Sequence, residues 1–229
     1  WPTTYGENMF LFPIDQWVGN IYHEHLHRVV AASVGFLCII LAVWLGLREE
    51  RRWLRWLAYG ALGAVILQGV LGGLTVRYML PTPISVSHAM LAQTFLVITV
   101  VIAYSLSKER ARRAEVSGSA GTNAVTWPAI LLVGLVFLQL FLGAMMRHTE
   151  SGLAIPDFPT MGGQWLPIFT PDTVAAINDA RYEIGHVNNQ PLEPIGIGQV
   201  WIHFMHRAGA LLVTLGAIVC TVAAHRVRS

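Results

Sequence analysis

The chain has 229 residues, of which 54% are hydrophobic and 12% are charged, and its formal net charge is +2. Soluble domains carry about 25% charged residues, so this composition excludes an ordinary soluble domain and indicates an integral membrane protein. The net charge itself says little about partners; we expect the lipid bilayer as the first partner and no nucleic acid.

Five apolar stretches are long enough to cross a bilayer. A helix of about 20 residues spans the ~30 Å of hydrocarbon. We therefore predict an all-α membrane protein, in which the first, third and fifth helices gain length from polar turns at their starts. The predicted spans are Val29–Leu47, Trp56–Val76, Ala89–Leu106, Trp127–Met146 and Ala208–Ala224.

Basic residues are distributed unevenly over the predicted loops. Ten of the fifteen follow the first, third and fifth spans. The positive-inside rule assigns these loops to the cytoplasm, so we expect residues 1–20 outside and the C-terminus inside. Cys38 and Cys220 both lie within apolar spans, and we expect them to be packing residues rather than a disulfide pair.

The sequence predicts two halves. Residues 108–124 are first charged and then rich in Gly and Ser, which predicts a flexible cytoplasmic linker between helical bundles at 1–107 and 125–229. The halves are similar, because HEHLHRVVAASVG (23–35) parallels WIHFMHRAGALLVTLG (201–216).

The external loops upstream of these two helices also match. WPTTYGENMFLFP (1–13) resembles FPTMGGQWLPIF (158–169), each with an aromatic residue, Pro and Thr followed by Gly and further aromatic residues. In the second half a helix precedes this loop, and in the first half two more helices follow the His-Arg helix. We infer a parent of two four-helix bundles, eight helices in all, of which about five are present.

A short surface helix is predicted in the long external segment 147–200. The stretch PDTVAAINDARYEIGH (171–186) has helical periodicity and begins with Asp172 as a candidate cap. The surrounding Pro and Gly residues suggest a lid over the outer membrane face. Its apolar face would carry Val174, Ile177 and Ile184.

Four of the nine histidines lie in the opening turns of predicted spans: His27 in the first, His88 in the third, and His203 and His206 in the fifth. A charge at mid-helix costs about 2.5–3.5 kcal/mol on translocon scales, so such residues persist where they face a bundle interior and have a partner. We interpret His27, His88 and His206 as ligands of a shared cofactor. Ordinary interfacial polarity is our interpretation for His23, His25 and His148.

The first span gathers ionisable residues on one face. Glu24 and His27 share this face with His23, and Arg28 lies on its flank. The fifth span repeats the arrangement with His203 in the place of Glu24. A bare metal ion would use clustered histidines and a carboxylate such as Glu24. Heme fits better, because two imidazoles from facing helices can sandwich the iron.

Small residues on the second span leave room for a porphyrin ring, although glycines also pack helices closely without any ligand. Arg28 and Arg207, beside the predicted ligands, could pair with heme propionates or simply extend to the membrane interface. The glycines are Gly69, Gly72 and Gly73, and two buried amides predicted to bond between helices are Gln68 and Gln139.

Together these features resemble the heme A synthase family over essentially the whole chain, and the combination is more specific than any single motif. Members have eight helices in two pseudo-symmetric bundles, in agreement with the repeat. Many carry a cysteine pair in an external loop; this chain has none there, which suits the subgroup without it. The matching residues are Glu24-x-x-His27-Arg28, His88, the SGLAIPDFP loop (151–159) and His206-Arg207.

The resemblance implies an oxidoreductase of the bacterial inner membrane that converts heme O to heme A, oxidising a ring methyl to a formyl group for terminal oxidase assembly. It implies that His27 and His88 hold the substrate porphyrin near the extracytoplasmic face and that Glu24 is important for activity. It also implies a heme b with His206 as one axial ligand, whose second ligand has no counterpart in this chain. The predicted cofactor-binding residues are therefore His27, His88, His206, Arg28, Arg207 and His203.

Glu24 could accept a proton or orient water while the ring carbon is oxidised. Heme O synthase, a terminal oxidase and a second copy of the chain are the candidate protein partners. Two other functions remain open: an electron-transferring membrane b-type cytochrome, and a non-catalytic heme-binding subunit of a larger membrane complex. Histidine ligands are compatible with all three functions, whereas Glu24 and the SGLAIPDFP loop favour the enzyme.

Overall fold

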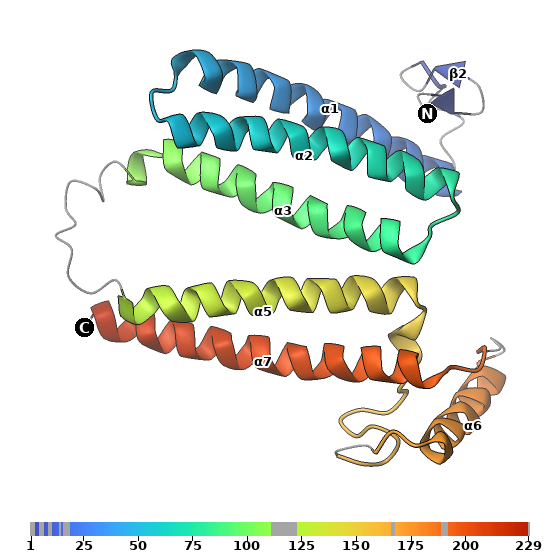
Figure 1. The fold of residues 1–229 in the computed structure, drawn as a ribbon. Helices are drawn as coiled ribbons and strands as arrows, with labels where there is room; N and C mark the ends of the chain where they lie inside the picture. Colours follow the sequence, from blue (N-terminus) through green and yellow to red (C-terminus); the bar gives the residue numbers. More distant parts are fainter. Residues whose placement is uncertain are drawn as a thin grey trace. The chain divides into compact units, whose positions relative to one another are not determined.

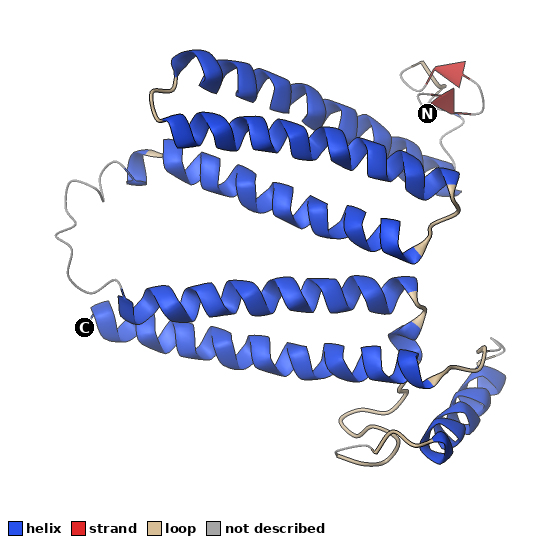
Figure 2. Ribbon diagram, viewed as in Figure 1, coloured by secondary structure: helices blue, strands red, loops and turns tan. Residues whose placement is uncertain are grey.

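The protein is described by a computed structural model that covers residues 3–4, 7–8, 11–13, 15, 19–110, 123–165, 168–188 and 192–228. Within these residues nearly all regular structure is helical, apart from a small hairpin of two-residue strands (Figure 2). The chain forms two compact units, Trp1–Ser117 (unit 1) and Gly118–Ser229 (unit 2), and the division falls within the predicted linker. Residues 111–122 of that linker lie outside the described residues.

Each unit has its own set of elements (Figure 1). Unit 1 contains β1 (Thr3–Thr4), β2 (Glu7–Asn8), α1 (Gly19–Arg48), α2 (Arg52–Arg77) and α3 (Thr82–Leu106). Unit 2 contains α5 (Asn123–His148), the 3-10 helix η2 (Ser151–Leu153), α6 (Pro171–Val187) and α7 (Ile197–Arg228).

The prediction of an all-α membrane protein with five spans is confirmed. Helices α1, α2, α3, α5 and α7 are each long and apolar enough to cross a membrane. At most 17% of the most apolar window of any of them is buried within the described protein. The helices extend beyond the apolar stretches into polar turns; α1 begins at Gly19, which brings His27 more than two turns inside it.

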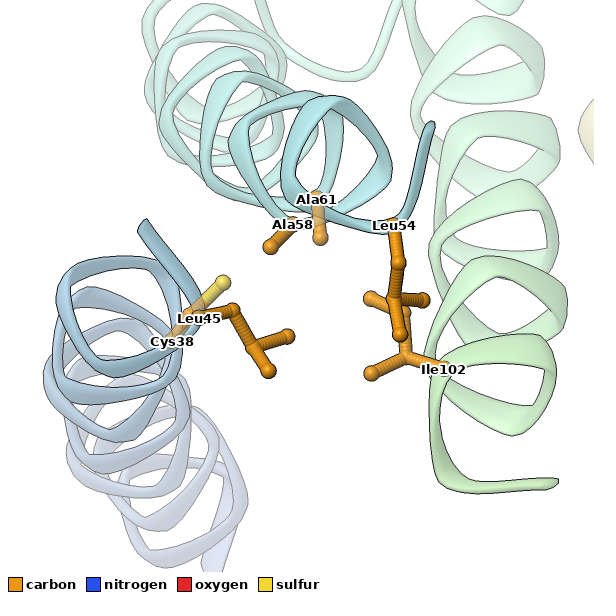
Figure 3. Close-up of a cluster of buried hydrophobic side chains, with 6 residues drawn as sticks. All are labelled: Cys38, Leu45, Leu54, Ala58, Ala61 and Ile102. Atoms are coloured by element: carbon orange, nitrogen blue, oxygen red, sulfur yellow. The ribbon is translucent and has the colours of Figure 1, made fainter. Parts of the chain in front are cut away.

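We call the end of each unit that carries the predicted histidine ligands its outer end and the opposite end its inner end, as names for the two ends only. The inner half of unit 1 is closely packed. Helix α2 packs against both α1 and α3. Figure 3 shows side chains from all three helices directed at one another, and each belongs to the half of its helix nearest the α1–α2 turn. Cys38 is 4% exposed and carries a free thiol, which confirms it as a packing residue. The cluster consists of Cys38, Leu45, Leu54, Ala58, Ala61 and Ile102.

An arginine fastens the same end of unit 1. Arg51, in the α1–α2 turn, donates from Nη1 to the backbone oxygen of Ser105 at the end of α3, at 3.0 Å. Its Nε also donates to Glu49, with 2.7 Å between Nε and Oε1. This hydrogen bond is the main reason why the pKa of Glu49 falls to about 2. The three helices are therefore held together where they leave the apolar region.

The outer half of unit 1 is open by comparison. All residues of α1 between His25 and Cys38 are described, and none of them is buried. On the facing part of α2, a Cβ added at Gly69 or Gly73 would meet no atom within 4 Å. The histidines of α1 and α3 thus lie at the loosely packed end of the unit, where a ligand could be accommodated.

Unit 2 is built on two long helices and an outer cap. Helices α5 and α7 pack side by side along their length (Figure 1). At the outer end, η2, α6 and the start of α7 enclose a second apolar cluster, to which Met161, Phe169, Val174 and Phe204 add partly buried side chains. We call this assembly the cap. Its buried residues are Ala154, Ile155, Ile177, Ile195 and Val200.

Helix α6 confirms the predicted surface helix, but its N-cap residue is not the predicted one. The side chain of Thr170 accepts a hydrogen bond from the backbone nitrogen of Thr173 at 3.2 Å, so Thr170 and not Asp172 is the N-cap. Pro171, at the first helical position, explains this difference of two residues, because it starts the helix and leaves Thr170 as the last extended residue before it. Asn178 pairs with the backbone of Ile195 through both ends of its amide, at 3.1 and 2.9 Å, and so ties α6 to the strand of chain entering α7.

The sequence repeat between the external loops has a structural counterpart. Aligning residues 1–8 with 158–165 places Thr4 on Met161 and Glu7 on Gln164. Thr4 pairs with Glu7 in the β1–β2 hairpin, and Met161 pairs with Gln164 in an isolated bridge. Both loops therefore make the same tight reversal of the chain.

Candidate functional site

The outer end of unit 1 brings two predicted ligands near each other. His27 comes from α1 and is exposed, whereas His88 comes from the first two turns of α3 and is half-buried. Helices α1 and α3 both pack against α2, and the course of the chain through the three helices places His27 and His88 at the same end of unit 1. Two imidazoles thus come from the two helices that flank α2, an arrangement that could hold a porphyrin between them.

His88 rests on a glycine and a glutamine of α2. Gln68 donates from Nε2 to the backbone oxygen of His88 at 3.0 Å, and its Nε2 lies 3.4 Å from the ring Nε2. A Cβ added at Gly72 would lie 3.2 Å from Cε1 of His88, so a larger residue would displace the ring. The ring Nδ1 is buried and has no hydrogen-bond partner among the described residues. Nothing in the described protein therefore competes for this nitrogen.

Unit 2 holds His206 in the same way. Gln139 on α5 donates from Nε2 to the backbone oxygen of His206 at 2.9 Å, and its Nε2 lies 3.1 Å from the ring Nδ1 and 3.3 Å from Nε2. A Cβ at Gly143 would lie only 3.0 Å from Cε1 of His206. The predicted interhelical bonds of both glutamines are confirmed, and in each case the partner is a predicted ligand.

The ionisable residues at the start of α1 have different surroundings. Glu24 forms an i,i+4 ion pair with Arg28, and their side chains are 57% and 15% exposed. His23 is exposed, as expected at a membrane interface. His25 is only 1% exposed and its ring centroid lies 5.4 Å from that of Phe12, so the interfacial interpretation is wrong for this residue. The external loop folds back over it.

Arg207 binds the backbone of the SGLAIPDFP loop. Its Nη2 donates to the oxygen of Ile155 at 2.9 Å, and its Nη1 donates to the oxygens of Asp157 at 2.8 Å and Thr160 at 3.3 Å. Its Nε donates to Nε2 of His203 at 3.0 Å. A guanidinium has five N–H groups, so these contacts leave one for any other acceptor.

His203 belongs to the cap in this structure. It is 6% exposed, and its Nδ1 accepts from the backbone nitrogen of Ile155 at 3.2 Å, while Nε2 faces Arg207. Both ring nitrogens therefore point at donors of the cap. Glu24, at the matching position of α1, instead presents a largely exposed carboxylate.

Asp157 organises the turn that follows the loop, and the sequence analysis did not single it out. Its carboxylate accepts from Thr160 Oγ1 at 2.6 Å and from the backbone nitrogens of Gly162 at 2.8 Å and Gly163 at 3.0 Å. Burial raises the pKa of Asp157, but these hydrogen bonds outweigh it and hold the pKa at about 2. Gly162 and Gly163 have φ of 64° and 77°, which explains the Gly-Gly pair. An Asp followed by Thr and Gly-Gly was the available signal.

The residues present fit a planar iron porphyrin better than a bare ion. The described residues contain no group of three or more His, Cys, Asp or Glu side chains that could hold a metal ion. Gly72 and Gly143 each leave a space beside a histidine ring that a Cβ would fill, and we call each of these spaces a glycine cradle. The buried Nδ1 of His88 has no hydrogen-bond partner among the described residues. These are the features expected where an imidazole is kept for an iron and the ring needs space beside a helix.

Comparison with known proteins agrees with this geometry. The model of the family COX15-CtaA, described as cytochrome oxidase assembly protein, matches residues 3–229. The heme A synthase of Halalkalibacterium halodurans is 27% identical over 222 residues, which cover 94% of this chain and 62% of that protein. The heme A synthase of Shouchella clausii is 29% identical over 175 residues, covering 74% of this chain and 56% of that protein.

A third relative, the heme A synthase of Paracoccus denitrificans, is 30% identical over 172 residues, covering 74% of this chain and 40% of that protein. The chain thus spans roughly half the length of the curated relatives that it matches. No solved structure matches it. The match over nearly all of the chain confirms the resemblance found in the sequence: the chain belongs to the cytochrome oxidase assembly protein family, in which these three relatives are heme A synthases.

Proposed function

We propose that this chain forms the catalytic part of a heme A synthase, an oxidoreductase that converts heme O to heme A by oxidising a ring methyl to a formyl group. The observation that supports this most is that His88 packs against Gly72 and Gln68 of α2 at the end of unit 1 where His27 lies on α1, the other helix packed against α2. Membership of the family supports a role in heme A biosynthesis for oxidase assembly.

The substrate porphyrin lies between His27 and His88. Gly69 and Gly73 leave open space on the neighbouring helix, which suits a flat and bulky ligand. Arg28 lies one residue beyond His27 and can share its guanidinium between Glu24 and a propionate, since its planar fork binds two carboxylates at once. The iron supplies the redox chemistry of the reaction, and the protein supplies position and polarity.

Glu24 is the proposed proton acceptor. It is a largely exposed carboxylate one turn before His27, and it forms an ion pair with Arg28. As the ring methyl loses hydrogen, Glu24 takes up a proton or orients the water that does so. His203 at the corresponding place in unit 2 is buried within the cap and offers no accessible carboxylate.

Unit 2 holds a resident heme b through His206. The glycine cradle and the glutamine contact are the same as those of His88, which supports the same kind of ligand. Arg207 and His203 stand beside this site and fix the loop above it. The single free N–H of Arg207 remains for a propionate.

The basic residues support an orientation with both sites near the extracytoplasmic face of the bacterial inner membrane. Arg51 and its neighbours mark the opposite, cytoplasmic end of unit 1. Heme O synthase as the source of substrate, and a terminal oxidase as the recipient of product, are the partners that such an enzyme requires. A second copy of the chain is a further candidate.

The test is the pigment bound by the Glu24→Ala variant of the full-length protein. We expect heme binding to persist while unconverted heme O or a partly oxidised form accumulates, because the ligands remain and the proton acceptor is gone. Glu50→Ala, at an exposed carboxylate of the opposite end, is the matched control and should leave the heme A yield unchanged. Heme A at the wild-type level in Glu24→Ala would remove Glu24 from the mechanism. A membrane cytochrome that only transfers electrons would contain heme b alone in every variant.

A further inference from the structure

Positive charge accumulates at the inner end of unit 1. Residues 48–55 contain four basic and two acidic side chains. Arg51 is neutralised by Glu49, with 2.7 Å between Nε and Oε1, whereas the exposed Glu50 forms no ion pair within the described residues. The other three basic side chains also have no ion-pair partner among the described residues. They are Arg48, Arg52 and Arg55, which we call the arginine surface.

Two neighbouring helix ends bring these arginines together. Arg48 is the last residue of α1 and Arg52 is the first of α2, and only a short turn separates them. Arg52 and Arg55 are three residues apart, so their side chains are neighbours on the surface of α2. Arg52 is exposed and Arg55 is half-buried. Their guanidinium groups are therefore available to a ligand that approaches this end of the unit.

A further cation comes from the segment that follows α3. The guanidinium of Arg110 lies 5.9 Å from the ring centroid of Trp53, the second residue of α2. This cation–π contact places Arg110 against the first turn of α2, which also carries Arg52 and Arg55. The positive charge at this end thus comes from all three helices of the unit and from the turns between them.

The position of the arginines on α2 is unfavourable for the protein alone. The N-terminus of a helix carries a partial positive charge, so it favours anions and disfavours cations. The first turn of α2 nevertheless contains two arginines and no acidic residue, and its N-cap residue Arg51 makes no side-chain cap hydrogen bond. At the other end of the same helix, Arg77 lies in the last turn, where a cation is favourable. An anion from outside the described protein would balance the charge at the first turn.

Exposed tryptophans indicate that this end of α2 lies at the level of lipid headgroups. Trp53 and Trp56 are 47% and 69% exposed, on a helix that is long and apolar enough to cross a membrane. Tryptophan side chains are enriched at the boundary between hydrocarbon and headgroups, where the available phosphates are those of phospholipids. A guanidinium binds phosphate oxygens through a planar fork. In the proposed orientation this end faces the cytoplasmic leaflet, which carries the anionic lipids.

We propose that the arginine surface binds the headgroup of an anionic phospholipid, with Arg52 and Arg55 on its phosphate and Arg48 beside them. Trp53 and Trp56 flank the start of its acyl chains. The lipid neutralises the end of unit 1 at which α1, α2 and α3 are most closely packed, and so stabilises that packing. This interaction is independent of the proposed heme chemistry, because it concerns the opposite end of the unit.

The test measures lipid binding by the full-length protein, purified in detergent and freed of its native lipids. Phosphatidylglycerol and phosphatidylcholine are titrated in turn, and native mass spectrometry gives the dissociation constant of the first lipid bound. The wild type should bind phosphatidylglycerol several-fold more tightly. Each basic residue near an anionic membrane surface contributes roughly fivefold to binding. Arg52→Gln combined with Arg55→Gln should therefore weaken phosphatidylglycerol binding at least about tenfold and leave phosphatidylcholine binding unchanged.

The matched control removes the same charge elsewhere. Arg77→Gln combined with Arg147→Gln, at two exposed arginines of the outer ends, should bind phosphatidylglycerol as the wild type does. Equal affinity of the wild type for both lipids would overturn the proposal. An equal loss of phosphatidylglycerol binding in the two double variants would also overturn it, because net charge alone would then explain the preference.

Two further measurements complete the test. Inorganic phosphate, added alone as a competitor, should not displace phosphatidylglycerol, and displacement would identify a site for a soluble phosphate in place of a lipid. If the first double variant does not accumulate, Arg52→Gln and Arg55→Gln are measured singly, and each should weaken phosphatidylglycerol binding roughly fivefold. Wild-type affinity in both single variants would overturn the proposal.

Discussion

The outer ends of the two units carry the same His-Arg helix start but use it differently. In unit 2, Arg207 donates hydrogen bonds to backbone oxygens of the SGLAIPDFP loop and contacts His203, which is buried within the cap. In unit 1, Arg28 pairs with the largely exposed Glu24. The position three residues before the predicted ligand therefore carries a buried imidazole, His203, in unit 2 and an exposed carboxylate, Glu24, in unit 1.

This difference separates a side chain that stabilises the fold, His203, from one that is accessible for chemistry, Glu24. A ring buried within the cap packs against the loop and is not accessible to a substrate outside the cap. A carboxylate beside an arginine and open to the outside can take up protons. Under the proposed function, the repeat would provide two similar places for a porphyrin, and the residue one turn before each proposed ligand would decide which of them performs chemistry.

The largest effect is expected at the ligands. His88→Ala should remove the substrate porphyrin from unit 1 almost completely and leave the heme b of unit 2, because the two units are separate compact bodies. His206→Ala should do the reverse. Spectra of the extracted pigments measure both, and His23→Ala, at an exposed histidine, is the control. Loss of both pigments in both variants would break the assignment of one porphyrin to each unit.

The arginines sharpen the comparison. Arg207→Lys should destabilise the cap by about 3 kcal/mol, because an ammonium cannot reach three carbonyls and buried hydrogen bonds to a charge are worth about 1.5–3 kcal/mol each. Hydrogen exchange of the amides at 155–163 measures this opening. Arg28→Lys should instead lower heme A yield with little change in thermal stability. The exposed Arg147→Lys is the control, and a fully protected loop in Arg207→Lys would contradict the anchoring role.

The carboxylate of Asp157 gives the cap a pH dependence. Its pKa in the folded protein is about 2, below the ordinary value of 3.8, so the ionised form stabilises the fold. This contribution, about 1–2 kcal/mol, is fully present above pH 4 and is lost as the pH falls toward 2. Asp157→Ala should therefore lower the unfolding temperature at neutral pH and converge with the wild type near pH 2. A constant difference between the two proteins over this range would show that the charge is not involved.

The smallest effect is expected at the cradles. Gly72→Ala places a Cβ 3.2 Å from His88, and Gly143→Ala places one 3.0 Å from His206, so both rings must shift by a few tenths of an ångström. We expect a few-fold faster heme loss, greater for Gly143→Ala. Gly60→Ala, in the opposite half of α2, adds a methyl to open space away from both histidines and is the matched control. Equal heme release from all three variants would mean that the cradles do not set the position of the rings.

Much of this arrangement could be predicted from periodicity and polarity. The five spans, the helix at 171–186 and the interhelical role of Gln68 and Gln139 follow from apolar length, helical spacing and the cost of a buried amide. The match between the external loops also survives as a shared tight reversal of the chain.

The remainder depends on where backbone atoms are placed by tertiary folding, which side-chain patterns do not encode. The acceptors of Arg207 are carbonyls about fifty residues away, and nothing in their side chains identifies them. His25 is covered by Phe12 only because the loop folds back. The N-cap of α6 is Thr170 and not the predicted Asp172, because Thr170 directly precedes the helix whereas Asp172 lies within its first turn.

The most direct test of the central claim is the heme composition of the purified full-length protein beside a variant that carries both His27→Ala and His88→Ala. The account predicts heme b together with heme O or heme A in the wild type, and heme b alone in the double variant. Heme O or heme A retained in full by the double variant would contradict it, because the porphyrin would then be held somewhere other than between α1 and α3.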